Sequence, residues 1–338
     1  MKYIEVNKQM GLKDCFCLIK TLDKKSTRNG KPYLDMVLAD ATGEVSAKLW
    51  DYDEIKHGDL APSMPVKVRG SEEEFKGAPQ FRVSNIRPIV DSDDFDVSEL
   101  VVSAPEDSKW MLGQIYTVLD AFEDEDLKKI VKYLLQKRGE SLLNAPAAVN
   151  MHHAERGGLL FHTLSMLRVA DRICEVYPFL DRELLLSGVI IHDLGKIDEM
   201  EINDLGLATK YTVQGELVGH LVKGAMEVEI AAKELGIDEE TALLLEHMVI
   251  SHHGVPEFGA AKYPSFAEAE VLSVIDNLDA TLFEFNTAIN AVGIGDFSAR
   301  QWSLDNRKIF NHGRTFGTPP RADLKEKESG IAGEHNDE

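Results

Sequence analysis

Residues 184–196 read LLLSGVIIHDLGK, an apolar run that ends in the adjacent pair His192 and Asp193. The run predicts a buried element, and a buried element that delivers two metal-type ligands has few purely structural uses. The dipeptide alone is weak evidence, because a chain with 11 histidines contains His-Asp pairs by chance. Its meaning depends on which other polar side chains the fold brings to it.

Histidines are concentrated around this pair, since eight of the 11 fall between positions 152 and 253. Candidate ligands recur every 23–32 residues, about one helix and a turn, so each helix of a bundle would supply one or two ligands to a shared centre. Imidazole with carboxylate suits Mn, Fe, Zn, Co or Ni, and the lack of nearby cysteine argues against a structural zinc site. The predicted metal ligands are His162, His192, Asp193, His220, His252, His253 and Asp276. Of the adjacent pair 252 and 253, His252 is the preferred ligand.

The region around the pair is predicted to be nearly all helical. Apolar residues at helical spacing occur over residues 110–137, 163–176, 183–191, 216–235, 239–251 and 267–292. We therefore expect an all-α domain over residues 108–317. An acidic, aperiodic stretch at 91–107 is the expected linker, and the polar tail 318–338 is expected to be disordered.

The N-terminal segment has a different pattern, with short strands separated by turn residues. The expected strands are 16–22, 33–39, 45–50, 66–70 and 80–86. Five strands within residues 1–90 predict a small closed barrel of the oligonucleotide-binding (OB) type, with an SH3-like barrel as the alternative. The predicted fold class is α+β and multidomain: a β-barrel followed by a helical bundle.

Charge separates the same two regions. The chain carries a formal net charge of −21, which argues against a protein that coats nucleic acid or a membrane with its whole surface. Residues 1–90 carry +2 and the remainder −23, so the barrel is the part suited to a polyanion. Three cysteines are too few for a disulfide framework, and no stretch approaches the roughly 18 apolar residues of a membrane span. We expect a cytoplasmic protein without a membrane partner.

The ligand order resembles that of the HD phosphohydrolase superfamily. The superfamily is named for a His-Asp dipeptide, which in this chain is His192-Asp193. His220, with His252 or His253, matches the two-metal members of that superfamily. The resemblance is carried by four fragments: GGLLFHT at 157–163, HDLGK at 192–196, GELVGH at 215–220 and IDNLDA at 275–280.

With its N-terminal barrel, the whole chain resembles the YhaM-type 3′-to-5′ exoribonucleases of bacteria. This resemblance implies an all-helical catalytic domain with manganese-dependent phosphodiesterase activity and a barrel that presents single-stranded RNA. We expect two divalent ions, manganese first, with Fe, Co, Ni, Zn or Mg as alternatives. Single-stranded DNA as a further substrate and a homo-oligomeric state are left open.

Individual roles follow from two-metal chemistry. Asp193 is expected to bridge the ions, and Lys196, one helical turn on, to touch a phosphate oxygen or orient the attacking water. His153 and Arg156 are expected to contact the substrate, and Gly157 with Gly158 to let backbone approach the site. In the barrel, basic and aromatic side chains are the expected contacts with single-stranded nucleic acid. These are Lys24, Arg28, Tyr33, Trp50 and Phe81.

Two other functions remain open from sequence. A small nucleotide, such as a cyclic dinucleotide or a nucleoside triphosphate, could replace the polymer at the same metal site. The Gly-Tyr-Pro motif of the cyclic-dinucleotide subgroup is absent after the paired histidines, where the chain reads Gly254-Val255-Pro256. A non-catalytic nucleic-acid-binding module is disfavoured because every expected ligand is present.

Overall fold

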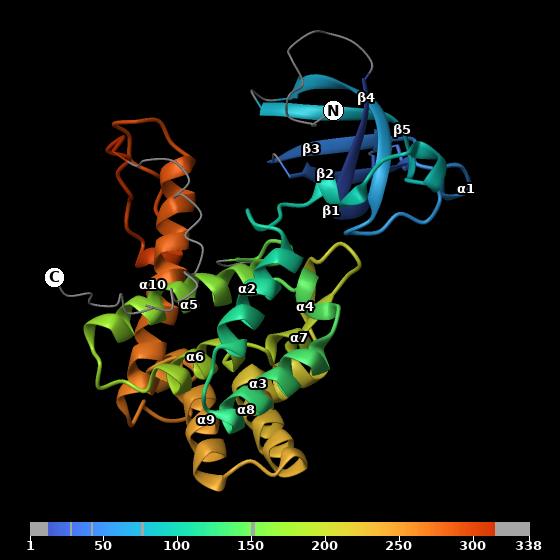
Figure 1. The fold of residues 1–338 in the computed structure, drawn as a ribbon. Helices are drawn as coiled ribbons and strands as arrows, with labels where there is room; N and C mark the ends of the chain where they lie inside the picture. Colours follow the sequence, from blue (N-terminus) through green and yellow to red (C-terminus); the bar gives the residue numbers. More distant parts are fainter. Residues whose placement is uncertain (1–12, 28, 42, 76–77, 150–152, 315–338) are drawn as a thin grey trace, which may run out of the picture.

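A computed structural model of the chain describes residues 13–27, 29–41, 43–75, 78–149 and 153–314. A closed β-barrel comes first and a bundle of helices follows it (Figure 1). The predicted fold class is confirmed. The predicted tail at 318–338 and the barrel residue Arg28 lie outside the described residues.

The barrel consists of β1 (Lys13–Ser26), β2 (Pro32–Asp40), β3 (Gly43–Trp50), β4 (Pro65–Phe75) and β5 (Ala78–Pro88). The strands close in the order β1-β2-β3-β5-β4, with β3 and β5 parallel and the other pairs antiparallel. A single-turn helix, α1 (Glu54–His57), lies between β3 and β4. This is the five-stranded arrangement predicted for an OB barrel rather than an SH3-like one.

Alternation along the strands decides which barrel side chains can meet a ligand. Phe81 of β5 points inward and is fully buried against Gly70, where an added Cβ would lie 2.6 Å from its ring. The prediction that Phe81 stacks on a base is therefore wrong, because its face of the strand forms the core.

The helical region is built around α6. Its main helices are α2 (Ser108–Asp120), α3 (Glu125–Arg138), α5 (Gly158–Val176), α6 (Arg182–Ile191), α8 (Val213–Leu235), α9 (Glu239–Ser251) and α10 (Ala267–Asn290). Every residue of α6 from Leu184 to Ile191 is buried, and α3, α5, α9 and α10 pack around it. The apolar run is thus the central helix of the bundle. None of the described helices is long and apolar enough to cross a bilayer.

The predicted helix 110–137 is two helices, α2 and α3, separated by a turn. Asp124 caps α3 by accepting hydrogen bonds from the amides of Asp126 and Leu127. The Glu183 carboxylate accepts from the amides of Glu123 and Asp124, so the turn has partners for its backbone. A helical period alone does not reveal such a cap in the middle of a run.

A β-hairpin interrupts the predicted all-α region. It consists of β6 (Met200–Ile202) and β7 (Ala208–Tyr211), and it follows the short helix α7 (Lys196–Glu199). Leu205 at its turn packs against Leu18 of β1 and against Leu100 and Val101 of the segment between barrel and bundle. These four side chains form an apolar joint between the two parts of the molecule.

A buried ion cluster ties α7 to the bundle. Arg138 at the end of α3 places Nη1 2.8 Å from Asp198 Oδ2, and its Nη2 donates to Glu227 of α8. Arg138 and Glu227 are both buried. A buried ion pair adds little net stability as a pair, but the loss of one partner leaves an uncompensated charge in the interior.

We predict that Arg138→Met lowers the free energy of unfolding by about 1–3 kcal/mol, because Glu227 then loses its main partner and keeps only longer contacts with Lys223 (3.4 Å) and Lys137 (3.7 Å). Urea denaturation followed by circular dichroism measures the change. Lys233→Met is the matched control, since Lys233 is exposed on α8 and pairs only with Glu229 in a helical surface pair. Equal midpoints for the two variants would contradict a structural role for the Arg138 cluster.

Candidate metal centre

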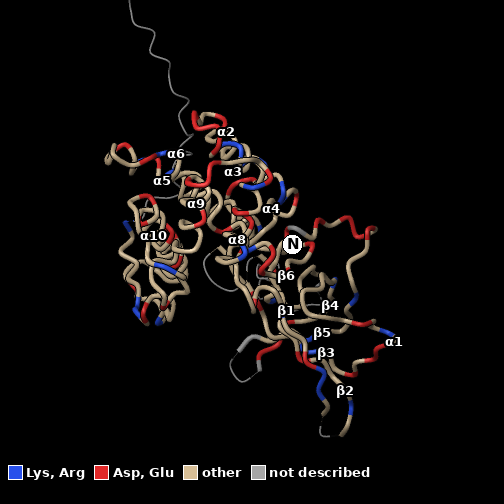
Figure 2. Tube along the Cα trace, turned by 90° about the horizontal axis from the view of Figure 1, so that it is seen from below, with Lys and Arg blue, Asp and Glu red and all other residues tan. Residues whose placement is uncertain are grey.

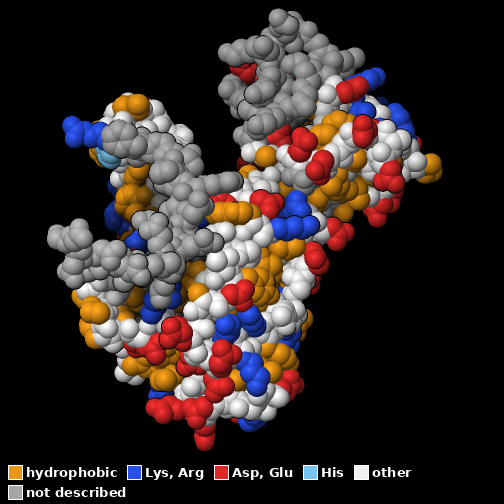
Figure 3. All heavy atoms as spheres, viewed as in Figure 1, with side chains coloured by type: hydrophobic (Ala, Val, Ile, Leu, Met, Phe, Trp, Pro, Cys, Tyr) orange, Lys and Arg blue, Asp and Glu red, His pale blue; other side chains and the backbone are white. Residues whose placement is uncertain are grey.

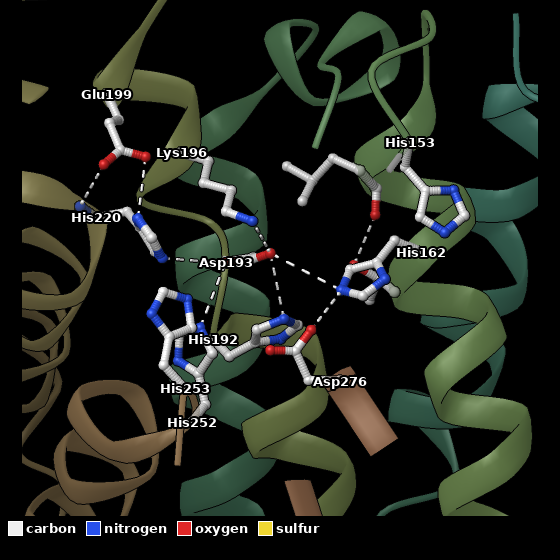
Figure 4. A network of polar contacts seen from close by, with 12 residues as sticks. His153, His162, His192, Asp193, Lys196, Glu199, His220, His252, His253 and Asp276 are labelled. Atoms are coloured by element: carbon white, nitrogen blue, oxygen red, sulfur yellow. Dashed lines mark hydrogen bonds and ion pairs between the residues drawn. The ribbon is translucent and has the colours of Figure 1, made fainter. Parts of the chain in front are cut away.

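Asp193 lies at the centre of the histidine cluster (Figure 4). The helix α6 ends at Ile191, and the following turn holds His192 and Asp193 among the surrounding helices, with both side chains buried. Asp193 Oδ2 lies 3.3 Å from His192 Nε2 and 3.9 Å from His162 Nε2. Asp193 Oδ1 lies 3.5 Å from His220 Nε2 and 3.6 Å from His252 Nε2. One carboxylate is therefore surrounded by four imidazoles from α5, α8 and the ends of α6 and α9.

Each of these imidazoles is oriented by an acceptor for its Nδ1 proton. The acceptors are Val189 O for His192 (2.9 Å), Val249 O for His252 (2.8 Å), Asp279 Oδ2 for His162 (2.8 Å) and Glu199 Oε2 for His220 (3.0 Å). Because Nδ1 donates in every case, it is Nε2 of each ring that faces Asp193. Histidines that bind metals are commonly fixed in this way, with the second ring nitrogen bound to a carbonyl or a carboxylate.

The residues fit a metal ion. Nε2 of His192, His220 and His252 and Oδ1 of Asp193 are buried and have no hydrogen-bond partner among the described residues. Buried polar atoms left in this state cost about 1–3 kcal/mol each. The separations of 3.2–3.9 Å between facing ligand atoms are close to the roughly 3.0–3.4 Å between neighbouring ligands of an ion with bonds of about 2.1 Å.

Ionisation states agree with a cation at this position. Burial lowers the pKa of His252 to about 3, so the ring is neutral and its Nε2 carries a lone pair. Burial opposes charge on Asp193, but the Lys196 ammonium, 2.7 Å from Oδ2, holds the pKa of that carboxyl well below its usual value. Burial also opposes charge on His162, yet hydrogen bonds to Asp276 and Asp279 raise its pKa to about 9. A cation bound at His162 therefore displaces a proton.

The ligand atoms form overlapping groups rather than one. His162, His192 and Asp193 bring ligand atoms within 4.8 Å of one another, and so do His220, His252 and His253. Asp276 joins the first side through Oδ1, 3.2 Å from His162 Nε2. The structure brings together all seven predicted ligands. His252 faces Asp193, whereas His253 donates from Nδ1 to Phe258 O at 2.8 Å and lies beside His220 and His252.

Two predicted substrate contacts are not at the site. His153 is only 2% exposed, packs against the Phe283 ring and places Nε2 2.9 Å from Asp279 Oδ2. Its predicted contact with substrate is wrong, because it is an interior residue. Arg156 donates from Nε to Asn144 Oδ1 at 2.9 Å and lines a separate cavity of about 410 Å³ near the start of α2. Arg156 therefore does not lie at the metal centre, and its contact with a phosphate of the substrate stays a prediction.

Close packing against the backbone requires glycine at position 158, one of the two glycines at the start of α5. A Cβ at this residue would lie 2.1 Å from the carbonyl oxygen of His153. Gly158 thus lets the His153 loop approach the start of α5, and not the substrate as expected. The packed loop places His153 against Asp279, the carboxylate that orients His162.

Two carboxylates that orient ligands were not predicted as site residues. Asp279 accepts from His153, His162 and Ser165. It follows the ligand Asp276 by three residues on α10, so helical spacing could have indicated it. Glu199 has no such signal, because 21 residues separate it from His220.

A glycine makes the contact between Glu199 and His220 possible. Gly219 has φ of +73° inside α8, a left-handed conformation that breaks the helix immediately before the ligand. The freed amide of His220 donates to Glu199 Oε1 at 3.2 Å, and the His220 ring donates to the other carboxylate oxygen. Glu199 therefore fixes both the backbone and the ring of this ligand.

Comparison with known proteins follows the same division of the chain. Residues 159–281 match the model of the HD domain family, a span that contains the ligands from His162 to Asp276. The chain is 38% identical to "3′-5′ exoribonuclease YhaM" of Bacillus licheniformis over 309 residues, which cover 90% of this chain and 96% of that protein. The YhaM of Bacillus subtilis is 37% identical, with 90% and 96% covered. This chain belongs to the YhaM family. Because such matches leave about a tenth of the chain uncovered, they include most of the barrel as well as the HD domain.

In this YhaM-family chain we predict that Asp279→Asn weakens Mn²⁺ binding about 10–100-fold, the usual effect of removing a carboxylate that orients a ligating histidine. Titration of the metal-free protein, followed by calorimetry, measures the affinity. Asp305→Asn is the control, because the Asp305 side chain is 91% exposed and lies far along the chain from any ligand. An unchanged affinity with a native helical content would remove Asp279 from the metal centre.

Proposed function

We propose that this chain is a metal-dependent 3′-5′ exoribonuclease that hydrolyses phosphodiester bonds of single-stranded RNA. The observation that carries the proposal is the buried convergence of imidazole Nε2 atoms on Asp193, in a member of the YhaM family. Two divalent ions, with manganese first, are part of the proposal. His162, His192 and Asp276 would hold one ion, His220 with His252 and His253 the other, and Asp193 would contact both.

Bound ions of this kind activate a water molecule and neutralise charge on a phosphoryl oxygen. The protein supplies the orientation. Asp279 and Glu199 hold His162 and His220 in the tautomer that presents Nε2, and the bundle excludes bulk water from the ligands. When the ligands are already fixed and buried, little rearrangement of side chains is needed as negative charge develops on the phosphate in the transition state.

Lys196 is the proposed phosphate contact of the catalytic domain. Its Nζ lies 2.7 Å from Asp193 Oδ2, and its side chain lines the cavity beside the metal centre. Burial opposes its charge, but the nearby Asp193 and Asp276 carboxylates outweigh this effect and raise the pKa of Lys196. The ammonium therefore stays charged next to the position where a phosphate would meet the ions.

The barrel offers a stacking platform for single-stranded RNA on the outer face of β2 and β3. Tyr33 and Trp50 are directly opposite each other in the register, with ring centroids 4.7 Å apart, and Trp50 is 40% exposed. Lys48 lies over both rings, 5.5 Å from the Tyr33 centroid and 5.6 Å from that of Trp50. An exposed aromatic pair with a cation above it is suited to bases and phosphates together.

The basic side chains of the barrel attract RNA less strongly than their number in the sequence suggests. Most basic side chains of the barrel pair with a carboxylate. Both blue and red positions accordingly occur along the barrel trace (Figure 2). Lys24 lies 3.5 Å from Glu54, and Lys25 lies 2.7 Å from Asp35. For Lys24 to contact RNA as proposed, an RNA phosphate would have to replace the Glu54 carboxylate as its partner. Stacking on Tyr33 and Trp50 is the larger proposed contribution to binding.

The helical domain does not attract a polyanion by itself. Acidic side chains are prominent on its face in Figure 3, especially at the end farthest from the barrel. An RNA substrate would approach more favourably from the barrel side. A small nucleotide would leave the Tyr33–Trp50 platform without a role, so the alternative of a small-nucleotide phosphohydrolase is not favoured.

The activity is tested with 5′-labelled single-stranded RNA and Mn²⁺, alongside a cyclic dinucleotide and a deoxynucleoside triphosphate. We expect a ladder of progressively shortened RNA from the native chain and a loss of at least about 1,000-fold for Asp193→Asn, since the carboxylate shared by the ligands is removed. Metal content measured on the same variant should fall with activity. Turnover of only the small nucleotides would overturn the proposed substrate.

For the barrel, we predict that Trp50→Ala weakens binding of single-stranded RNA about 5- to 100-fold, because one stacked base contributes roughly 1–3 kcal/mol. Fluorescence anisotropy with labelled RNA in the absence of divalent metal measures it. Phe179→Ala is the control, as Phe179 is an exposed aromatic residue of the helical domain that lines neither described cavity. Equal effects of the two substitutions would argue against the platform.

A further inference from the structure

We propose that a cavity beside the metal centre holds the 3′-terminal nucleotide of the substrate, and that Glu284 at its far end recognises the free terminal hydroxyl. The inference rests on the proposed exonuclease function. It specifies which kind of RNA end the site accepts: a 3′-hydroxyl end, with a 3′-phosphate rejected.

The cavity begins at the metal centre and follows one face of α10. Its volume is about 380 Å³, within the range of small-ligand pockets. Lys196, His252, His253 and Asp276 form its metal end. The α10 residues that line it fall on a single helical face, at spacings of three and four: Ser273, Asp276, Asn277, Ala280, Thr281 and Glu284. A continuous wall thus runs from a metal ligand to a carboxylate.

The length of this wall suits one nucleotide. Asp276 and Glu284 are eight residues apart, which corresponds to about 12 Å along a helix axis. That span leaves room for a metal-bound phosphate and one sugar between the two carboxylates. Asn277 and Thr281, which hydrogen-bond to each other at 3.0 Å, lie between them and offer polar atoms to the sugar.

An exposed aromatic ring also lines the cavity. Phe258, at the end of the single-turn segment Pro256–Phe258, lines the cavity and is 68% exposed. Its carbonyl oxygen accepts the hydrogen bond from His253 Nδ1, so the backbone that carries the ring is held beside a candidate ligand histidine. A base can stack on this ring whatever its identity.

The far end of the cavity is closed by a segment that follows α10. Ser303 and Leu304, in the turn Trp302–Leu304, line the cavity, and Leu304 is buried against Ala288. Ser303 Oγ donates to Glu284 Oε2 at 3.1 Å. This hydrogen bond occupies one carboxylate oxygen and orients the other.

A carboxylate at this position distinguishes chain ends by charge. It accepts a hydrogen bond from a sugar hydroxyl, whereas it repels a phosphate that carries the same sign of charge. Hydrolysis adds the water oxygen to phosphorus and breaks the bond to the 3′ oxygen of the penultimate nucleotide, which takes up a proton. The released 5′-monophosphate therefore has its phosphate at the metal end and its free hydroxyl toward Glu284.

The test compares two 5′-labelled RNAs that differ only in a 3′-hydroxyl or 3′-phosphate end. We expect the native chain to degrade the 3′-phosphate RNA at least about tenfold more slowly, since like charges face each other in a confined site. Glu284→Gln should bring the two rates within about threefold by speeding up the 3′-phosphate RNA. Glu270→Gln, at an exposed position on the same helix, should keep the native ratio.

A binding measurement separates this inference from the proposed function. Calorimetry on the metal-loaded protein should show that adenosine 5′-monophosphate binds at least about tenfold more tightly than adenosine 3′,5′-bisphosphate, and that Glu284→Gln removes the difference. Phe258→Ala should weaken both nucleotides about 5- to 100-fold. Native chain that degrades both RNA ends equally, or a Glu284→Gln ratio equal to the native one, would overturn the role of Glu284. Failure of the native chain to shorten either RNA would instead overturn the exonuclease function.

Discussion

A single buried carboxylate, Asp193, sets the conditions that the rest of the bundle meets. It lies at the end of the most deeply buried helix, where an isolated charge would be strongly unfavourable. Helices on several sides direct imidazole nitrogens and one ammonium at it, and the acceptors behind the imidazoles are fixed by backbone or by further carboxylates. The arrangement suits an ion, which would stabilise the fold and would be positioned for the proposed chemistry.

The sequence indicated which side chains converge, because metal ligation restricts residue type and order. His162 and Asp276 lie on helices whose apolar period is visible, and the His192-Asp193 pair directly follows such a helix, so their convergence follows from packing. Glu199 could not be found in the same way, since its role depends on a left-handed glycine 20 residues later that breaks a helix at one position. Contacts that depend on one local backbone angle are not encoded in periodicity.

Errors in the prediction share one physical origin, which is the direction of a side chain. Residue type predicts Phe81 and His153 to be substrate contacts, yet both side chains are buried. Successive side chains of a strand point to opposite faces, so for Phe81 on β5 one step of register exchanges a ligand face for an interior face. His153 lies in a turn, and its direction is set by the local backbone. The position of Arg156 depended on a cavity that forms only in three dimensions.

The β6–β7 hairpin has a mechanical consequence. The chain leaves Glu199, passes through Leu205 in the apolar joint with the barrel, and returns to His220. The barrel and one half of the candidate metal centre are thus connected through this short hairpin, in addition to the segment with Leu100 and Val101 that packs into the same joint. A displacement of the barrel against the bundle would therefore disturb the Leu205 turn, whose two strands lead directly to Glu199 and toward His220.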